Sequence, residues 1–208
     1  MIKEKRIVVG VDHVQGDRLS SNKRVVLDFL RKHVKEGTRV GLEVSPIMLN
    51  IMKSDMTSNI LFHDVIELIT EKKGVVVPLD SWHAYLAAYG HFNDSQSYPD
   101  DFHNNRAHVN FIKTNILRSK NMLRNMLNKN NVQIAVMGAN HARDIELFAK
   151  HLPLTVKYFY EPNKERYDVL SEEELSELAA RFKTIKLIKQ KKPLLKKPIT
   201  SFILKERK

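Results

Sequence analysis

The sequence predicts an α/β protein whose mostly parallel sheet is flanked by helices. Short apolar runs alternate with longer stretches in which apolar residues recur every three or four positions, the patterns of buried strands and of amphipathic helices. A strand joined to the next through a helix runs parallel to it, because the crossover returns the chain to the same edge of the sheet. With 208 residues, the chain is long enough to bury a sizeable core.

Five apolar runs are the expected strands. Valine, isoleucine and leucine dominate them, and each run is far too short to span a membrane. They cover residues 7–11, 39–44, 75–79, 132–137 and 154–160.

The expected helices carry their apolar residues on one stripe. Gly37 and Gly74 follow the first two as stop signals, and the run Ser-Glu-Glu-Glu starts the last one. Pro46 opens a further helical stretch, since proline suits the first helical position. The main helices are expected at about residues 22–35, 59–73, 101–129, 141–151 and 171–182. Residues 84–100 show no clear period and stay unassigned.

The composition indicates a soluble protein of the cytoplasm. Hydrophobic residues make up 42% and charged residues 28% of the chain, which is ordinary for a globular protein. The charged first residues lead into only a short apolar run, unlike a signal peptide, and no stretch suits a membrane-spanning helix. The absence of cysteine excludes disulfides, thiolate metal ligands and a cysteine nucleophile. Any metal must therefore be held by nitrogen and oxygen ligands.

Most of the net charge of +11 belongs to the C-terminal segment. Residues 183–208 contain ten Lys or Arg and one Glu, so a nearly neutral domain of residues 1–182 precedes a basic tail. Because apolar residues are interleaved with the charges, the tail either docks on the domain or a partner subunit, stays solvated, or contacts a polyanion such as nucleic acid or an acidic membrane surface. The lysines expected to contact nucleic acid are Lys189, Lys191, Lys192, Lys196 and Lys197.

Two copies of one short motif mark the candidate site. The motif Gly-X-X-His ends at His13 and again at His141, each time after an expected strand, and its glycine allows a tight turn out of the sheet. Glu43 ends the second strand, and Asp80 with His83 follows the third. Because the carboxyl ends of parallel strands share one edge, where ligands bind in open α/β sheets, we expect these side chains to converge.

Two imidazoles and a carboxylate have the chemistry of a metal site or of an acid–base centre. His13, Glu43 and His141 match the ligand set of a divalent transition metal, such as Mn, Co, Fe or Zn, with positions left for water and substrate. Such an ion polarises a carbonyl and activates water. Without a metal, Glu43 or a histidine acts as a general base on water. The residues leave both possibilities open, and Asp80 and His83 are expected to contact the substrate.

Arg106 is the expected electrostatic partner at this site. In the long helix it lies one turn before Val109, at the border of the apolar stripe, which directs its guanidinium toward the sheet. A partly buried arginine needs a carboxylate or a substrate anion, and Glu43 or an oxyanion formed during reaction supplies one. The alternative is an ordinary surface arginine. Its neighbour Asn105 is expected to make polar contacts with the substrate.

The order of these residues resembles that of the TraB/Tiki superfamily, whose wider circle includes erythromycin esterase-like and ChaN-like proteins. The family pattern has Gly-X-X-His after the first strand, a glutamate after the second, an arginine on a central helix and a second Gly-X-X-His after a late strand. Here His13, Glu43, Arg106 and His141 stand in these places, over about residues 6–160. The resemblance implies hydrolysis: Tiki proteins are metal-dependent proteases, erythromycin esterases open a lactone, and ChaN-like members bind haem.

The sequence therefore predicts a cytoplasmic hydrolase, metal-assisted and acting on a peptide, ester or lactone. His13 and His141 bind the metal or act as base, Glu43 is a ligand or general base, and Arg106 steadies Glu43 or the oxyanion. A protease in the cytoplasm needs confinement, which a homo-oligomer is one way to provide. The competing prediction is a protein without catalysis that binds haem or a metal between the histidines, or nucleic acid through the tail.

Overall fold

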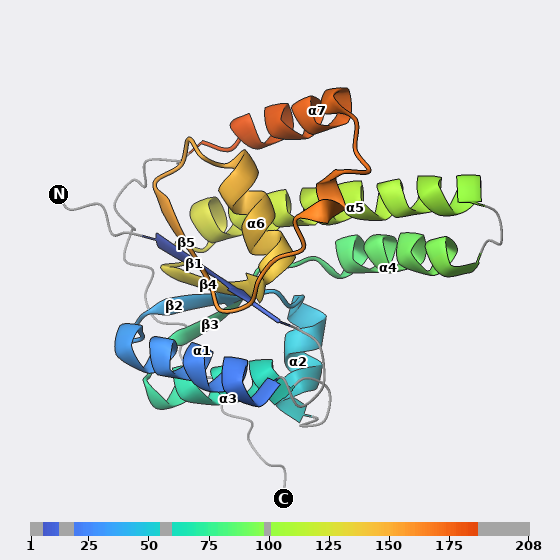
Figure 1. Ribbon diagram of the computed structural model, residues 1–208. Helices are drawn as coiled ribbons and strands as arrows, with labels where there is room; N and C mark the ends of the chain where they lie inside the picture. Colours follow the sequence, from blue (N-terminus) through green and yellow to red (C-terminus); the bar gives the residue numbers. More distant parts are fainter. Residues whose placement is uncertain (1–5, 13–18, 55–59, 98–100, 187–208) are drawn as a thin grey trace, which may run out of the picture.

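The computed structural model describes residues 6–12, 19–54, 60–97 and 101–186. Its centre is a five-stranded sheet in which every pairing is parallel, in the order β3-β2-β4-β1-β5 (Figure 1). The strands are β1 (Arg6–Val11), β2 (Arg39–Leu42), β3 (Val75–Pro78), β4 (Ile134–Gly138) and β5 (Leu154–Tyr158). The α/β fold predicted from the sequence is therefore confirmed.

Helices cover both faces of this sheet (Figure 1). Those on one face are α1 (Leu19–His33), α2 (Pro46–Ser54) and α3 (Ile60–Glu71). Those on the other are α5 (Asp101–Arg124), α6 (Ala139–Phe148) and α7 (Glu172–Lys183). Successive strand residues alternate between the two cores: Val8 packs with α5 and α6, and Val9 packs with α1 and α3. Burial on both faces explains why the strands appear as unbroken apolar runs.

α4 (Trp82–Ser97) is the helix that the sequence did not reveal. It packs along α5, and the two helices form a hairpin that extends beyond the sheet (Figure 1). Tyr85, Leu86 and Tyr89 of α4 are exposed, whereas Ala88 is buried. Because large apolar side chains lie on the solvent side, the segment lacks the contrast between faces by which amphipathic helices are recognised.

The long helix predicted for residues 101–129 is α-helical only as far as Arg124. It continues as a π-helical turn, η1 (Asn125–Lys129). Nδ2 of Asn125 donates a hydrogen bond to the carbonyl oxygen of Leu79 (2.7 Å). The changed winding therefore coincides with a side-chain contact to the chain that follows β3.

Neither motif glycine makes the tight turn expected from the sequence, and Gly10 serves close packing instead. Gly10 lies inside β1, where a Cβ atom would come within 2.9 Å of Tyr158 Cδ1 and 3.0 Å of Ala142 Cβ. A side chain at this position would push against α6. Gly138 ends β4 with φ −54° and ψ 143°, angles that most residues adopt. Neither glycine uses the positive φ for which glycine is favoured.

The packed domain extends beyond the predicted boundary at residue 182. Phe182 and Ile185 are buried, with 0% and 3% of their surface exposed. Nε2 of His151 lies 3.2 Å from the carbonyl oxygen of Ile185. The five tail lysines predicted to contact nucleic acid lie outside the described residues. Within the described ranges, no helix has both the length and the apolar character needed to cross a membrane.

Candidate active site

Side chains from two neighbouring strands meet at the carboxyl edge of the sheet. Glu43 directly follows β2, and His141 lies in the first turn of α6, after β4. β2 and β4 are paired, with Leu42 opposite Val136. This register brings Oε1 of Glu43 to 3.1 Å from Nε2 of His141. The structure therefore brings these two predicted site residues together.

Glu43 is held by the backbone of β4. Its N–H donates to the carbonyl oxygen of Val136 (3.1 Å), and its Oε2 accepts a hydrogen bond from the N–H of Gly138 (2.6 Å). Only 9% of the Glu43 side chain is exposed. The carboxylate thus accepts from a backbone donor at the N-terminus of α6, where the helix dipole favours a negative charge.

Arg118 of α5, and not Arg106, is the arginine of this site. Its Nη2 atom lies 2.5 Å from Oδ2 of Asp80, which follows β3, and 3.4 Å from Oε1 of Glu43. Its Nη1 donates to Oδ1 of Asn115 (2.7 Å). Burial alone would lower the pKa of Arg118, but its hydrogen bond to Asp80 and the charges of Asp80 and Glu43 raise the pKa overall. The guanidinium therefore stays charged.

Arg106 lies nearer the start of α5, and its side chain is exposed. The expectation that its guanidinium points toward the sheet is wrong. It rested on the neighbouring Val109, which is itself only half-buried because this part of α5 lies in the hairpin with α4. Arg118, further along the same helix, is the residue that reaches the carboxyl edge.

Sequence reasoning missed Ser119, which binds the other nitrogen of His141, and Asp144, which binds Ser119. Nδ1 lies 2.6 Å from Oγ of Ser119 on α5, and this Oγ lies 2.6 Å from Oδ2 of Asp144 on α6. The same Oγ is 3.0 Å from the carbonyl oxygen of Asn115. Ser119 and Asp144 are both fully buried. His141 is therefore bound on both sides of its ring.

Donors surround Asp144. The hydroxyl of Tyr167 donates to Oδ1 (2.6 Å), and Nη2 of Arg166 lies 3.5 Å from Oδ2. Both residues belong to a 3₁₀ turn, η2 (Glu165–Tyr167). Burial, followed by the charge of Asp144, raises the pKa of Tyr167, so its hydroxyl keeps the hydrogen that it donates. Asp144 is thus a buried carboxylate with a donor on each oxygen.

The hydrogen positions around His141 follow from these partners. Because the carboxylate of Asp144 and the carbonyl oxygen of Asn115 only accept, the single hydroxyl hydrogen of Ser119 goes to one of these two. Oγ of Ser119 then accepts, so Nδ1 of His141 carries a hydrogen. On the other side of the ring, Nε2 faces the Glu43 oxygen at 3.1 Å, where two lone pairs would repel each other. One positive charge, a proton or a metal ion, therefore belongs between these two atoms.

His141 and Glu43 suit two positions in the coordination shell of a divalent ion. Imidazole nitrogen and carboxylate oxygen are common ligands, and a ligating histidine typically donates its other N–H to a protein acceptor, as Nδ1 does to Ser119. His13, the third predicted ligand, lies outside the described residues. Asp12, directly before it, lines the same cavity as Glu43. The residues present fit a metal, and the predicted ligand set is complete only with His13.

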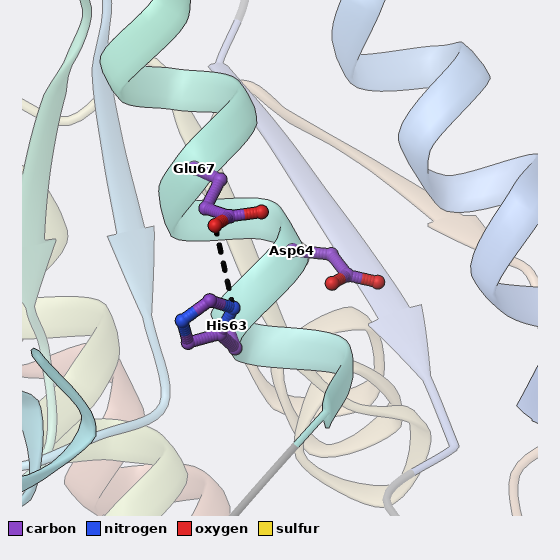
Figure 2. A group of neighbouring side chains, drawn as sticks. All are labelled: His63, Asp64 and Glu67. Carbon is purple, nitrogen blue, oxygen red and sulfur yellow. Dashed lines mark ion pairs between the residues drawn. The ribbon is translucent and has the colours of Figure 1, made fainter. Parts of the chain in front are cut away.

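Another group of potential ligands lies on α3, on the opposite face of the sheet from α5 and α6. His63, Asp64 and Glu67 each offer a ligand atom within 4.8 Å of the others (Figure 2). Nδ1 of His63 is 3.9 Å from Oε1 of Glu67, whereas the carboxylate of Asp64 points to the other side (Figure 2). Asp64 pairs with Lys23 of α1. Since Asp64 already has a cationic partner and Glu67 is exposed, these contacts are those of a solvated helix surface.

A cavity of about 810 Å³ opens beside Glu43 and His141. Phe111 of α5 lines one part of it, and Tyr160 and Pro162, from the segment after β5, line another. Pockets of this size hold small molecules or short stretches of peptide. The pair is therefore accessible to a ligand, although each of the two side chains is only 9% exposed.

Of the other predicted substrate contacts, Asp80 and His83 do not line this cavity. Asp80 is buried, and its carboxylate is engaged by Arg118 and by the N–H of Ser81 (2.8 Å). His83 is exposed on α4. Asn105 belongs to α5, but its side chain lies outside the described part of the structure. Asp80 therefore acts on the site through Arg118.

One signal in the sequence pointed to Ser119. The apolar stripe of α5 includes Ile112, Ile116 and Leu123, and Ser119 falls on this stripe at the expected three- and four-residue steps. A small polar residue on an otherwise apolar face needs a hydrogen-bond partner once it is buried. The sequence signal for Asp144 was weaker: it lies three residues after His141, a spacing that places both side chains on the same face of a helix.

Comparisons with known proteins add nothing to this geometry. The chain matches no protein-family model, no curated protein and no solved structure. The fold and the site define an α/β protein with a carboxylate–imidazole pair at the carboxyl edge of a parallel sheet. The resemblance to the TraB/Tiki pattern stays a prediction from the residues that carry it.

Proposed function

We propose that the protein is a hydrolase of the TraB/Tiki type that cleaves a peptide, ester or lactone bond. The observation that supports this most directly is the contact of 3.1 Å between Glu43 and His141 beside a cavity of about 810 Å³. A carboxylate and an imidazole in contact form a pair through which protons are taken up and released. Hydrolysis needs one proton removed from water and one delivered to the leaving group.

The two residues divide these tasks. The carboxylate of Glu43 takes a proton from the water that attacks the carbonyl carbon, and His141, protonated on Nε2, gives a proton to the leaving oxygen or nitrogen as its bond to carbon breaks. Transfer of the proton from Glu43 to Nε2 across their contact restores the starting state. In the alternative form of the site, a divalent ion held by His13, Glu43 and Nε2 of His141 would take the place of the Nε2 proton, polarise the carbonyl and activate the water.

The charges that line the cavity favour a substrate with a cationic group. Besides Glu43, the residues that line the cavity include Asp12, Glu161 and Glu165, of which Glu161 pairs with Lys164. Arg166 also lines the cavity, but the guanidinium of Arg166 faces Asp144 and so does not offset these negative charges. Field lines from several carboxylates in a concave site attract cations. We therefore expect amine-bearing esters or basic peptides to be cleaved faster than matched anionic substrates.

The test is a hydrolysis screen of the purified full-length protein. The panel contains peptides, esters and lactones in matched cationic, neutral and anionic forms, each with and without added Mn, Co, Fe or Zn. Glu43→Gln and His141→Ala are expected to lower the rate by about 10²–10⁴-fold, the usual contribution of general acid–base groups. Glu36→Gln, an exposed glutamate before β2, and His151→Ala, an exposed histidine after α6, serve as controls and should retain the rate.

Two results would overturn this proposal. One is a folded protein that hydrolyses nothing in the panel under any of the metal conditions. The other is hydrolysis that survives both Glu43→Gln and His141→Ala. Metal content measured on the same preparations tests the metal part separately: a near-stoichiometric ion that is lost in His13→Ala and in His141→Ala supports it.

A further inference from the structure

We propose that Ser119 and Asp144 are positioning residues that fix the hydrogen of His141 on Nδ1 and thereby keep Nε2 available to the cavity. The part of this inference that concerns catalysis rests on the proposed function. The hydrogen position itself does not, because it follows from contacts between side chains.

The first argument is the number of hydrogens that the contacts require. Oγ of Ser119 lies 2.6 Å from both Nδ1 of His141 and Oδ2 of Asp144, yet a hydroxyl carries one hydrogen. Asp144 also accepts from Tyr167 and faces Arg166, so it is a carboxylate that needs donors. The serine hydrogen therefore goes to Asp144 or to the carbonyl oxygen of Asn115, 3.0 Å away, and because neither of these can donate, His141 must supply the hydrogen between Nδ1 and Oγ.

The second argument is that Asp144 cannot reach the ring by itself. Its Oδ2 lies 3.9 Å from Nδ1 of His141, too far for a hydrogen bond. The Ser119 hydroxyl spans this gap. Removing only the hydroxyl therefore separates the carboxylate from the ring while its contacts with Tyr167 and Arg166 remain.

The third argument is the cost of the arrangement. Asp144 and Ser119 are completely buried, and three separate segments, α5, α6 and η2, supply the polar atoms. Burying a charge is costly, and apolar residues of similar size often stabilise such a position better. A buried charged network that contacts only one side of a site residue is therefore well suited to orienting that residue.

Without Ser119 and Asp144, His141 would prefer the other tautomer. A neutral imidazole facing the Glu43 carboxylate would place its single hydrogen on Nε2 and donate it to Oε1, 3.1 Å away. In that tautomer Nε2 has no lone pair with which to bind an ion or to take the proton back from Glu43. Ser119 and Asp144 oppose it by binding a hydrogen on the opposite nitrogen.

Nitrogen NMR of the isotopically labelled full-length protein tests the hydrogen position directly. The His141 signals are identified by their loss in His141→Ala, and Nδ1 is expected to resonate as a protonated nitrogen. In Ser119→Ala the Nδ1 signal should move toward the unprotonated range, and Ser119→Thr, which keeps the hydroxyl, should restore it. Signals of His151 in the same spectra serve as the internal control and should not move.

Asp144→Asn is the second variant. Its Oδ1 still accepts from Tyr167, so its amide NH₂ faces Ser119 and donates, which frees the serine hydrogen for Nδ1 of His141 or for the carbonyl oxygen of Asn115. The expected change in the His141 signals is therefore in the same direction as in Ser119→Ala, but smaller. Nδ1 signals that stay as in the unmodified protein in both variants would overturn the inference.

Kinetics separate this inference from the proposed function. With a substrate from the screen, Ser119→Ala should lower kcat about tenfold or more, the usual effect of removing a partner that orients a site histidine, with KM unchanged. Ser119→Thr should recover most of the loss. If Nδ1 shifts as expected but no substrate is ever hydrolysed, the positioning role stands and the hydrolase proposal fails.

Discussion

Arg118 and Asp80 form a buried ion pair, with 2.5 Å between Nη2 and Oδ2, that joins the C-terminal part of α5 to the segment directly after β3. The same Nη2 atom lies 3.4 Å from Glu43, so one guanidinium serves two carboxylates from neighbouring strands. The backbone joins the same two segments, since the N–H of Asp80 donates to the carbonyl oxygen of Val44 (3.1 Å). Arg118 therefore adds a side-chain link between two strand ends and also orients the candidate acid–base pair.

Replacing Arg118 should be strongly destabilising. In Arg118→Met, Asp80 and Glu43 remain buried without their cation, and breaking a buried ion pair in this way costs about 3–5 kcal/mol. Urea unfolding of the purified variant measures this loss. Arg106→Met on the same helix is the matched control, because Arg106 is exposed, and its free energy of unfolding should change by less than about 0.5 kcal/mol. Equal losses in the two variants would contradict the assignment of Arg118 to the site.

The close packing of Gly10 gives a second prediction. Gly10→Ala would place a Cβ atom 2.9 Å from Tyr158 and 3.0 Å from Ala142, so β1, β5 and α6 must shift apart, at a cost of about 1–3 kcal/mol. Because α6 carries His141, the variant should also lose activity more than stability alone explains.

Gly90→Ala is the opposite case and serves as the control for Gly10→Ala. Gly90 lies within α4 and a Cβ atom there meets open space, so alanine should stabilise the helix by about 0.5–1 kcal/mol. Both values come from urea unfolding under one set of conditions. A Gly10→Ala protein as stable as the unmodified one would show that α6 is free to move at this contact.

The sequence was informative where burial is periodic and uninformative where a polar group pairs with a distant one. The strands and the meeting of Glu43 with His141 were predictable because parallel strands place their carboxyl ends at one edge. The choice of arginine was not, since Arg106 and Arg118 lie on the same helix and only the position of α5 over the sheet distinguishes them. The helix α4 was not predicted, because its exposed aromatic residues remove the periodic alternation of apolar and polar positions.

The buried position of Ile185 predicts where the chain can be shortened. A protein ending at Phe182 loses this side chain from the core, together with its carbonyl contact to His151, and should be about 1.5–3 kcal/mol less stable than the full chain. A protein ending at Lys186 keeps both and should unfold at the same urea concentration as the full chain. Equal stability of the two shortened proteins would show that Ile185 contributes nothing.

The protein ending at Lys186 also tests the predicted polyanion contact of the tail. It lacks Lys189, Lys191, Lys192, Lys196 and Lys197. If these lysines bind nucleic acid, the full chain should bind RNA or DNA with an affinity that falls steeply with salt, by a slope of about −0.9 per duplex phosphate contacted. The shortened protein should lose that binding, as measured by fluorescence anisotropy. Binding that is independent of salt, or unchanged by the truncation, would contradict the prediction.

The lowered pKa of Glu174 predicts how the stability of the protein falls in acid. It pairs with Lys113 of α5 and accepts a hydrogen bond from the N–H of Ser171 (2.9 Å), and these donors, Lys113 first, lower its pKa in the folded protein. A depressed pKa means that the stabilisation is present above the ordinary range of a glutamate and is lost as pH falls through the folded value. Glu174→Gln should therefore lower the Tm at neutral pH, and the difference from the unmodified protein should shrink toward zero in acid. Glu173→Gln is the control, because Glu173 lies in the same first turn of α7 but is exposed. If both variants show a pH-dependent Tm difference of equal size, the effect belongs to the helix dipole and not to the contacts of Glu174.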